Sequence, residues 1–320
     1  MRKVNPQDWE VAVLGAGTMG LCIAQLFAMH GHQVYLYNRT PANLDKALIQ
    51  IQHNLDTLLQ LNQIEKETIE KTLKNIHGSS DLKESVKTAD FIIENVAEKV
   101  GLKQQIFSQL DEYCDSDIIF ASDTSTMNIY EFVEISHPER LIITHFFNPA
   151  YVMPLVELVR GPQTSDEVTN VVKEFLSLSG KTVAVLNKAI PGFILNRITM
   201  AVFREASYIA SQGFATPEDI DRAIVSTFGP RYTFEGPFAL SDFAGIDIYE
   251  RLGLLLPPEL NSDTECPQIL KDKISEGKLG VKTLEGFYKY EDSAKAHHMR
   301  DTKIIKMIES INQVNKEMEN

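Results

Sequence analysis

An apolar run near the start of the chain breaks into three glycines. Residues 11–20 read VAVLGAGTMG, and Gly15, Gly17 and Gly20 have the spacing G-x-G-x-x-G. Between a buried strand and a helix, the first glycine permits a tight turn and the second lets the backbone approach a pyrophosphate. The third lets the helix pack closely on the strand. We therefore predict a dinucleotide-binding loop. A strand–helix turn without a ligand is the alternative.

The apolar segment after the glycines predicts a helix over residues 19–30. The first N–H groups of a helix have no partner within it, and the helix dipole is positive at that end. Phosphate groups therefore bind at such a terminus. The residues expected to contact the cofactor here are Gly15, Gly17, Thr18, Met19 and Gly20.

The second apolar run, at residues 34–37, ends without the acid usual at this position. In dinucleotide-binding domains that acid accepts hydrogen bonds from the ribose 2′-OH and selects NAD, whereas an Arg accommodates a 2′-phosphate. Here Asn38 and Arg39 follow the run. A guanidinium can pair with a phosphate through two hydrogen bonds. We expect NAD(P) as cofactor, with NADP favoured. An NAD site in which Asn38 binds the ribose and Arg39 faces solvent is the alternative.

Apolar and helical patterns alternate through the first half of the chain. Seven strands are predicted, at residues 10–14, 33–37, 91–94, 118–122, 141–144, 155–159 and 182–186. The connections are long enough for helices, which indicates an α/β fold with a doubly wound, parallel, Rossmann-type sheet. The polar stretch between the second and third of these strands carries Leu and Ile at helical spacing and predicts a helical hairpin.

Strand signals end near residue 187 and helical periodicity follows. Helices are predicted at residues 194–213, from 217 onward, and at 242–255, 267–276 and 294–320. Thr216 before Pro217, with acids in the next turn, is typical of a helix N-terminus. We therefore predict a dinucleotide-binding domain over residues 1–186 and an all-helical domain over residues 187–320.

The 320-residue chain is acidic, with 31 Lys and Arg against 44 Asp and Glu and a net charge of −13. This balance argues against nucleic acid and anionic membranes as partners, since both bind basic patches. No apolar stretch is long enough to span a bilayer, and the first residues lack the apolar core of a signal peptide. Cys22, Cys114 and Cys266 lie far apart, which predicts a cytoplasmic protein with no metal site and with these cysteines in the core.

Two ionisable side chains lie in or beside apolar strands of the first half. His145 and Asn148 follow the run at residues 141–144, at a strand end where ligands bind in open α/β sheets. Glu157 lies inside the apolar run at residues 154–159, and a buried acid needs a partner. An imidazole would serve, and the carboxylate would hold it in one tautomer. His145 and Glu157 are therefore a candidate general-base pair. A structural histidine and an edge-facing glutamate are the alternative.

Eight short motifs then occur in a fixed order. They are GAGTMG at 15–20, IIENVAEK at 92–99, ASDTST at 121–126, HFFNP at 145–149, PLVELV at 154–159, PGFILNR at 191–197, EGPF at 235–238 and EGFYKY at 285–290. In this order the chain closely resembles the 3-hydroxyacyl-CoA dehydrogenase family, short-chain 3-hydroxybutyryl-CoA enzymes included, along nearly its whole length. The resemblance implies an oxidoreductase that moves a hydride between C3 of a 3-hydroxyacyl-CoA and NAD(P). It also implies a homodimer formed by the helical domain.

The resemblance implies a role for each matching residue. His145 corresponds to the general base that takes the proton of the 3-hydroxyl, and Glu157 to the acid that orients it. Ser125 corresponds to a serine that contacts substrate and cofactor, and Asn196 to an asparagine of the substrate site. The other implied cofactor contacts are Glu98, Lys103, Asn148 and Lys282.

The chain departs from the family at three places. Asn38 replaces the ribose acid, and Asp123 stands where the family has Asn. The predicted hairpin, near Asn54 and residues 61–62, also lacks the Ser and Lys that the family offers to CoA phosphates. Relatives on this fold oxidise free 3-hydroxy acids such as carnitine and gulonate. Such an acid remains an alternative substrate, and a non-catalytic dinucleotide-binding protein is a further alternative.

Overall fold

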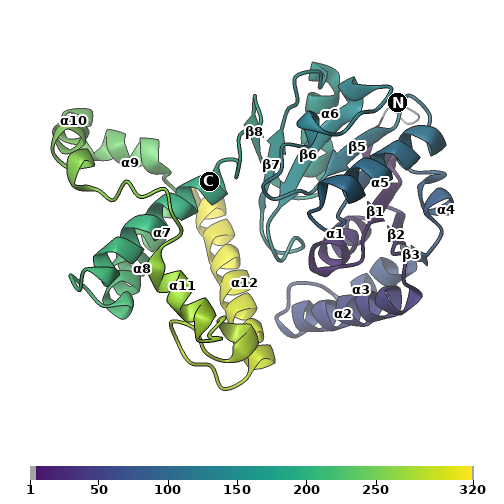
Figure 1. The fold of residues 1–320 in the computed structure, drawn as a ribbon. Helices are drawn as coiled ribbons and strands as arrows, with labels where there is room; N and C mark the ends of the chain where they lie inside the picture. Colours follow the sequence, from purple (N-terminus) through teal and green to yellow (C-terminus); the bar gives the residue numbers. More distant parts are fainter. Residues whose placement is uncertain (1–4, 319–320) are drawn as a thin grey trace. The chain divides into compact units, whose positions relative to one another are not determined.

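The computed structural model describes residues 5–318 (Figure 1). The chain forms two compact units, Met1–Arg197 and Ile198–Asn320. The first unit contains the whole sheet and the second consists of helices and their connections.

An eight-stranded sheet forms the centre of the first unit, in the order β3-β2-β1-β4-β5-β6-β7-β8. The strands are β1 (Val11–Leu14), β2 (Val34–Tyr37), β3 (Ile76–Ser79), β4 (Phe91–Glu94), β5 (Ile119–Ser122), β6 (Leu141–Phe146), β7 (Leu155–Val159) and β8 (Thr182–Leu186). The chain winds outward from β1 in one direction and from β4 in the other. This order confirms the predicted doubly wound sheet.

One neighbouring pair breaks the parallel pattern. β6 and β7 pair antiparallel, whereas all other neighbours are parallel. The expectation of a wholly parallel sheet is therefore wrong at this pair. Only residues 147–154 connect the two strands, and a parallel crossover needs about a dozen residues or more.

Helices cover both faces of the sheet, so its central strands are buried on both sides. Val11 and Val13 of β1 belong to one hydrophobic cluster, and the alternating residues Ala12 and Leu14 belong to the other. The first cluster includes residues of α1 (Thr18–Met29), α2 (Pro41–Gln60), α3 (Lys66–Lys74) and α6 (Asp166–Leu178). The second includes residues of α4 (Leu82–Val86) and α5 (Val100–Tyr113).

The helical hairpin predicted between the second and third predicted strands is present as α2 and α3, which lie side by side (Figure 1). The edge strand β3 follows them and was not predicted. Of its four residues only Ile76 is buried, so the sequence IHGS shows neither the alternating nor the continuous apolar pattern of a strand.

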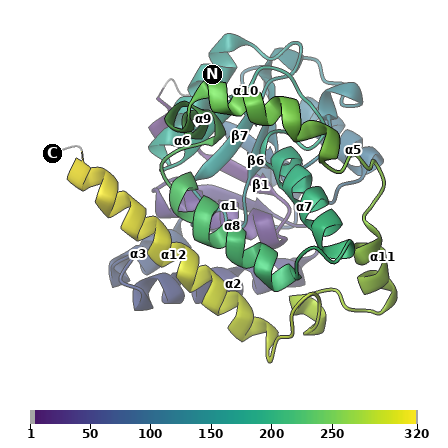
Figure 2. The same cartoon turned by 90° about the vertical axis from the view of Figure 1, so that its left-hand side faces the viewer.

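Six α-helices form most of the second unit in the described part of the chain (Figure 2). They are α7 (Leu195–Ser211), which begins in the first unit, α8 (Pro217–Tyr232), α9 (Pro237–Ala244), α10 (Ile246–Leu255), α11 (Gln268–Ser275) and α12 (Ser293–Met318). The Thr216 side chain accepts a hydrogen bond from the Asp219 N–H, which confirms the predicted start of α8. The single helix predicted over residues 242–255 is wrong, because Gly245 has φ 101° and separates α9 from α10.

The cysteines do not all lie in the core. Cys22 is buried and Cys114 is half-buried, but Cys266 is exposed. The expectation for Cys266 is wrong because this residue lies in the connection before α11. Within residues 5–318, every helix is too short or too polar to cross a membrane.

Candidate active site

The glycine loop connects β1 to α1, and its three glycines meet different surroundings. Gly15 has φ +120°, and a Cβ there would lie 2.5 Å from the Asn95 carbonyl oxygen. A Cβ on Gly20 would lie 1.7 Å from the carbonyl oxygen of Gly15. A Cβ on Gly17 would meet nothing within 4 Å. The fold therefore needs glycine at the first and third positions, while the second leaves open space against the backbone.

That open space adjoins the start of α1. Gly17 is the N-cap residue, and no side chain caps the helix. Thr18 is exposed and Met19 is half-buried in the first turn. Free N–H groups at a helix start bind phosphate. The loop therefore has space and free N–H groups suited to the pyrophosphate of a dinucleotide, and the contacts of the individual residues with it stay predictions.

At the end of β2, the Asn38 side chain is engaged in a local turn. Its Oδ1 accepts hydrogen bonds from the Thr40 N–H at 3.0 Å and from Asn43 Nδ2 at 3.4 Å. Arg39 beside it is exposed. With Oδ1 engaged, Asn38 offers its amide N–H groups rather than an acceptor to a nearby ligand.

His145 and Glu157 are directly opposed residues of the antiparallel pair β6 and β7. His145 Nδ1 lies 2.8 Å from Glu157 Oε2. The two residues are 5% and 0% exposed. Directly opposed residues of an antiparallel pair point to the same face of the sheet, so the backbone register itself brings the two side chains together.

Glu157 is also bound at its other oxygen. Oε1 accepts hydrogen bonds from the backbone N–H groups of Ile194 at 2.9 Å and Leu195 at 2.8 Å, where α7 begins. Burial alone would raise the pKa of Glu157, but the hydrogen bonds from His145 and from these N–H groups outweigh it and lower the pKa. A charged Glu157 accepts a hydrogen bond from the Nδ1–H of His145, and Nε2 is then free to accept a proton.

Two aromatic rings lie beside the imidazole. The ring centroids of Phe147 and Phe193 are 4.5 and 5.5 Å from that of His145. Phe193 is fully buried and has φ 52°, a left-handed conformation that costs free energy outside glycine. Gly192 before it also has positive φ. This left-handed turn directs the N–H groups at the start of α7 toward Glu157.

Three further predicted site residues are linked to one another. Glu98 Oε1 accepts hydrogen bonds from the Ser125 N–H at 2.8 Å and from Ser125 Oγ at 3.3 Å. The amide of Asn196 donates to the Ser125 carbonyl oxygen at 3.0 Å. Burial raises the pKa of Glu98, but hydrogen bonds from Ser125 and Thr124 and the charge of Lys103 lower it overall. Ser125 is thus held by Glu98 at its N–H and hydroxyl groups and by Asn196 at its carbonyl oxygen.

Lys103 is buried beneath this network. Its ammonium lies 2.8 Å from both carboxylate oxygens of Glu94 and 3.4 Å from Glu98, and it is 1% exposed. Ser122 Oγ donates to Glu94 at 2.6 Å. Lys103 therefore supports the loop from below, and a direct contact with a cofactor remains a prediction. Glu94 was not predicted, although it ends an apolar strand as an unpaired acid in sequence, the signal that identified Glu157.

Asp123 directly follows β5. Its Oδ1 accepts a hydrogen bond from the backbone N–H of Phe146 at 2.7 Å, one residue after His145. Burial is the main cause that raises the pKa of Asp123 well above its usual value, and the charge of Glu94 adds to it. Asp123 therefore ties β5 to the strand that carries His145.

Two further predicted cofactor residues are exposed in their own units. Asn148 is exposed and precedes Pro149 across a cis peptide bond. Lys282 is exposed in the short helix Val281–Thr283 of the second unit. Their contacts with a cofactor remain predictions.

Comparisons with known proteins agree with these features. The sequence model of the 3-hydroxyacyl-CoA dehydrogenase NAD binding domain matches residues 10–189, and that of the C-terminal domain of the same family matches residues 192–290. A 3-hydroxybutyryl-CoA dehydrogenase of Clostridioides difficile is 36% identical over 88% of this chain and 99% of its own length.

A second kind of relative is named for a pyridine carboxylate substrate. The 5-formyl-3-hydroxy-2-methylpyridine 4-carboxylate 5-dehydrogenase of Mesorhizobium japonicum is 32% identical over 88% of this chain and 90% of its own length. A solved structure of an enzyme of this name, described as an NAD+ dependent dismutase, has a TM-score of 0.87 and 29% identity. It covers 95% of this chain and 99% of the solved chain.

The family matches extend over both units, and the glycine loop fits the nicotinamide dinucleotide that the family binds. The chain is thus an oxidoreductase of the nicotinamide-dependent kind, and it belongs to the 3-hydroxyacyl-CoA dehydrogenase family.

Proposed function

We propose that the protein is an NAD(P)-dependent dehydrogenase of a 3-hydroxy compound in which His145 is the general base and Glu157 its partner. The observation that carries the proposal is the buried contact of 2.8 Å between the two side chains. A neutral imidazole with one nitrogen fixed by a carboxylate is a suitable base near neutral pH.

The proposed reaction needs one proton acceptor from the chain. The bound dinucleotide supplies a hydride acceptor or donor at its nicotinamide ring. Loss of hydride from C3 places positive charge on that carbon unless the hydroxyl proton leaves with it. His145 Nε2 takes this proton, and the charged Glu157 stabilises the resulting imidazolium. In the opposite direction His145 returns the proton to the new alcohol oxygen.

Ser125 and Asn196 are proposed to hold the reacting oxygen. The bond from Asn196 to the Ser125 carbonyl oxygen and the bonds from Ser125 to Glu98 fix the backbone of this loop. A fixed loop positions a hydroxyl without a loss of freedom at the moment of reaction. Ser125 is half-buried and therefore accessible to a ligand.

A short-chain 3-hydroxyacyl-CoA such as 3-hydroxybutyryl-CoA is the first proposed substrate. Both family models and the Clostridioides difficile relative support it. NADP is the favoured form of the cofactor in this proposal, because the end of β2 presents Asn38 and the exposed Arg39 and no carboxylate.

A free 3-hydroxy acid such as carnitine or gulonate, or a ring carboxylate, is the second candidate. The similarity to the pyridine carboxylate enzyme supports it. The hairpin offers little to CoA phosphates near Asn54, whose amide already donates to Gln25 Oε1 at 2.9 Å. Lys66, Lys71 and Lys74 of α3 alternate with acids, which dilutes their charge.

A matrix of substrates and cofactors tests these proposals. Acetoacetyl-CoA, a longer 3-ketoacyl-CoA, carnitine and gulonate are each assayed with NAD(H) and NADP(H) by the absorbance of the reduced nicotinamide. We expect turnover of acetoacetyl-CoA. Turnover of a free acid alone would overturn the CoA proposal and retain the dehydrogenase. Binding of a dinucleotide with no turnover of any compound would favour a non-catalytic protein.

We further propose that the helical unit forms a homodimer. Neither α9 nor α10 buries a residue in the described structure. Phe243 on α9 is 82% exposed and Leu254 on α10 is 77% exposed. Large apolar side chains gathered on exposed helices are typical of a protein–protein interface.

A further inference from the structure

The second unit contains a cavity of about 350 Å³ that lies within the unit itself. One wall is a face of α7, and the opposite wall is the segment that leads into α11. We call it the α7–α11 pocket, and its lining residues are Arg204, Ser207, Tyr208, Ser211, Gln212, Asn261, Asp263, Glu265, Cys266, Pro267, Gln268, Ile269 and Lys271.

The α7 wall has helical spacing. Arg204, Ser207, Tyr208 and Ser211 stand at positions i, i+3, i+4 and i+7, so they share one face of the helix. The backbone N–H of Asn261 donates to Glu205 Oε2 at 2.8 Å and fastens the opposite wall to the same helix. The pocket is therefore a feature of packed secondary structure.

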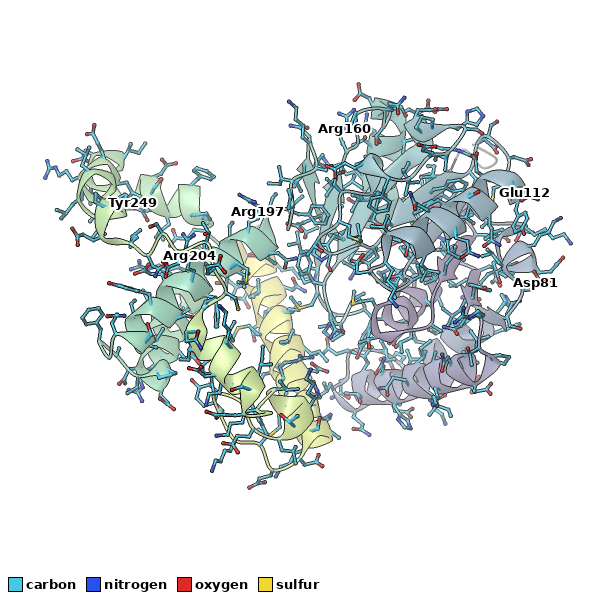
Figure 3. All side chains as sticks on the ribbon, viewed as in Figure 1. Asp81, Glu112, Arg160, Arg197, Arg204 and Tyr249 are labelled. Atoms are coloured by element: carbon cyan, nitrogen blue, oxygen red, sulfur yellow. The ribbon has the colours of Figure 1, made fainter. Side chains whose placement is uncertain are left out.

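Arg204, labelled in Figure 3, carries a charge without a counter-ion. Its Nε is buried and has no hydrogen-bond partner, and its side chain forms no ion pair within residues 5–318. Arg222 of the same unit differs, since it lies at hydrogen-bond distance from Asp219. A partly buried guanidinium without an anion is unfavourable unless a ligand supplies one.

Ser207 adds a second unsatisfied group on the same wall. It is 7% exposed, and its Oγ is buried without a partner in the described structure. Serines inside helices usually bond to the carbonyl oxygen of the preceding turn. Ser177 and Ser310 do so here, at 2.9 Å each. The hydroxyl of Ser207 therefore has unused hydrogen-bonding capacity in the wall of the pocket.

The opposite wall restricts the kind of anion. Asp263 and Glu265 are exposed at the pocket, and Asp263 Oδ2 accepts a hydrogen bond from Asn261 Nδ2 at 3.0 Å. With Lys271 and Arg204 the four charges sum to zero, which disfavours a multiply charged phosphate. Tyr208 and Ile269 supply apolar surface for the body of a small molecule.

We propose that the α7–α11 pocket binds a small monocarboxylate with a compact apolar body, its carboxylate held by Arg204 and Ser207. A guanidinium pairs with a carboxylate through two parallel hydrogen bonds, and a serine hydroxyl can donate to the same group. This site lies in the second unit and is independent of the dehydrogenase proposal.

Calorimetric titration of the full chain, without dinucleotide or substrate, tests the site. The probes are benzoate and butyrate, with inorganic phosphate as the comparison. We expect saturable binding of the carboxylates, one per chain, and weaker binding of phosphate. Arg204→Met should weaken carboxylate binding about tenfold or more, and Ser207→Ala about 2- to 10-fold. Arg222→Met, which alters an arginine that already has a partner, should have no effect.

Circular dichroism and thermal melting establish that each variant is folded. If Arg204→Met does not fold, Ser207→Ala alone decides, because removal of one hydroxyl leaves the wall intact. Absence of saturable carboxylate binding to the wild-type chain overturns the proposal, including the case in which a second copy of the chain fills the pocket. Full affinity in a folded Arg204→Met or Ser207→Ala variant, or tighter binding of phosphate, also overturns it.

Discussion

His145 on β6 and Glu157 on β7 face each other across an antiparallel strand pair, and 2.8 Å separate their side-chain atoms. A shift of one residue in the pairing of two strands turns every side chain to the other face of the sheet. The register of this pair is therefore a condition for the proposed chemistry.

Replacement of the proposed base should strongly reduce turnover without loss of cofactor binding. His145→Gln keeps the size and polarity of the side chain but cannot take a proton. We expect turnover to fall by about 10²- to 10⁴-fold, the usual contribution of a general base. The affinity for dinucleotide, measured by fluorescence titration, should not change. Near-normal turnover in this variant would falsify the assignment.

Substitution of Gly20 should affect the stability of the protein, whereas substitution of Gly17 should affect the binding of the dinucleotide. Gly20→Ala places a Cβ 1.7 Å from the carbonyl oxygen of Gly15. It should lower the free energy of unfolding by about 1–3 kcal/mol or more. Gly17→Ala meets nothing within 4 Å and should leave stability nearly unchanged. Its methyl group would occupy the space proposed for the pyrophosphate, so affinity for dinucleotide should fall. Urea unfolding and cofactor titration measure the two effects, and equal affinities for Gly17→Ala and wild type would contradict the loop assignment.

The end of β2 should set the choice between the two dinucleotides. Asn38→Asp introduces a carboxylate that accepts from the ribose 2′-OH and repels a 2′-phosphate. It should shift the ratio of kcat/KM toward NAD(H). Arg39→Met should weaken NADP(H) alone, because NAD(H) lacks that phosphate. If Arg39→Met weakened both dinucleotides equally, the proposed role of Arg39 would be wrong.

Asp123 should give the protein a pH dependence that Asn does not. Because burial raises its pKa in the folded chain, the unfolded chain loses this proton first as the pH rises from about 4. The free energy of unfolding then falls with rising pH until the folded carboxyl also ionises. Asp123→Asn should remove this fall while its amide oxygen keeps the bond from Phe146. Urea unfolding at acidic and neutral pH should show that the free energy of unfolding falls more with rising pH in the wild type than in Asp123→Asn. An equal change in the two proteins would refute the effect.

The exposed helices α9 and α10 should hold two chains together. Phe243→Glu and Leu254→Glu place charges on apolar surface that we propose to be buried in a dimer, and should shift the protein toward monomer in light scattering. Ile49 on α2 is 58% exposed. Ile49→Glu is therefore the matched control and should leave the mass of the protein in solution unchanged. A wild-type protein of monomer mass would exclude the dimer.

Much of the fold follows from local pattern. Six of the eight strands are largely apolar runs of four or five residues, and their predicted bounds differ by at most one residue from the structure. β6 extends two residues beyond the predicted end and includes His145. The predicted strand ended before this polar residue, although the side chain is buried against Glu157. β3 is absent from the prediction because packing at a sheet edge, and not its own composition, makes IHGS a strand.

The site shows the same limit. A buried acid in an apolar run predicts a buried partner, and on this ground Glu157 and His145 are predicted to pair. It does not say which partner an acid has. Glu94 binds Lys103, a lysine that the family resemblance assigned to the cofactor. The partner of a long side chain depends on which elements pack beside it in the fold. The local sequence around Lys103 therefore does not predict its burial.

Glu157 accepts a hydrogen bond from the N–H of Ile194 just before α7, although the two residues are 37 positions apart in the chain. The helix thus borrows its N-terminal cap from the strand that carries the proposed acid of the base pair. A mutation at Glu157 therefore harms folding as well as chemistry, whereas a mutation at His145 spares the helix start. In related proteins that have lost the activity, His145 should therefore vary freely. Glu157 should be retained, because the start of α7 still depends on it.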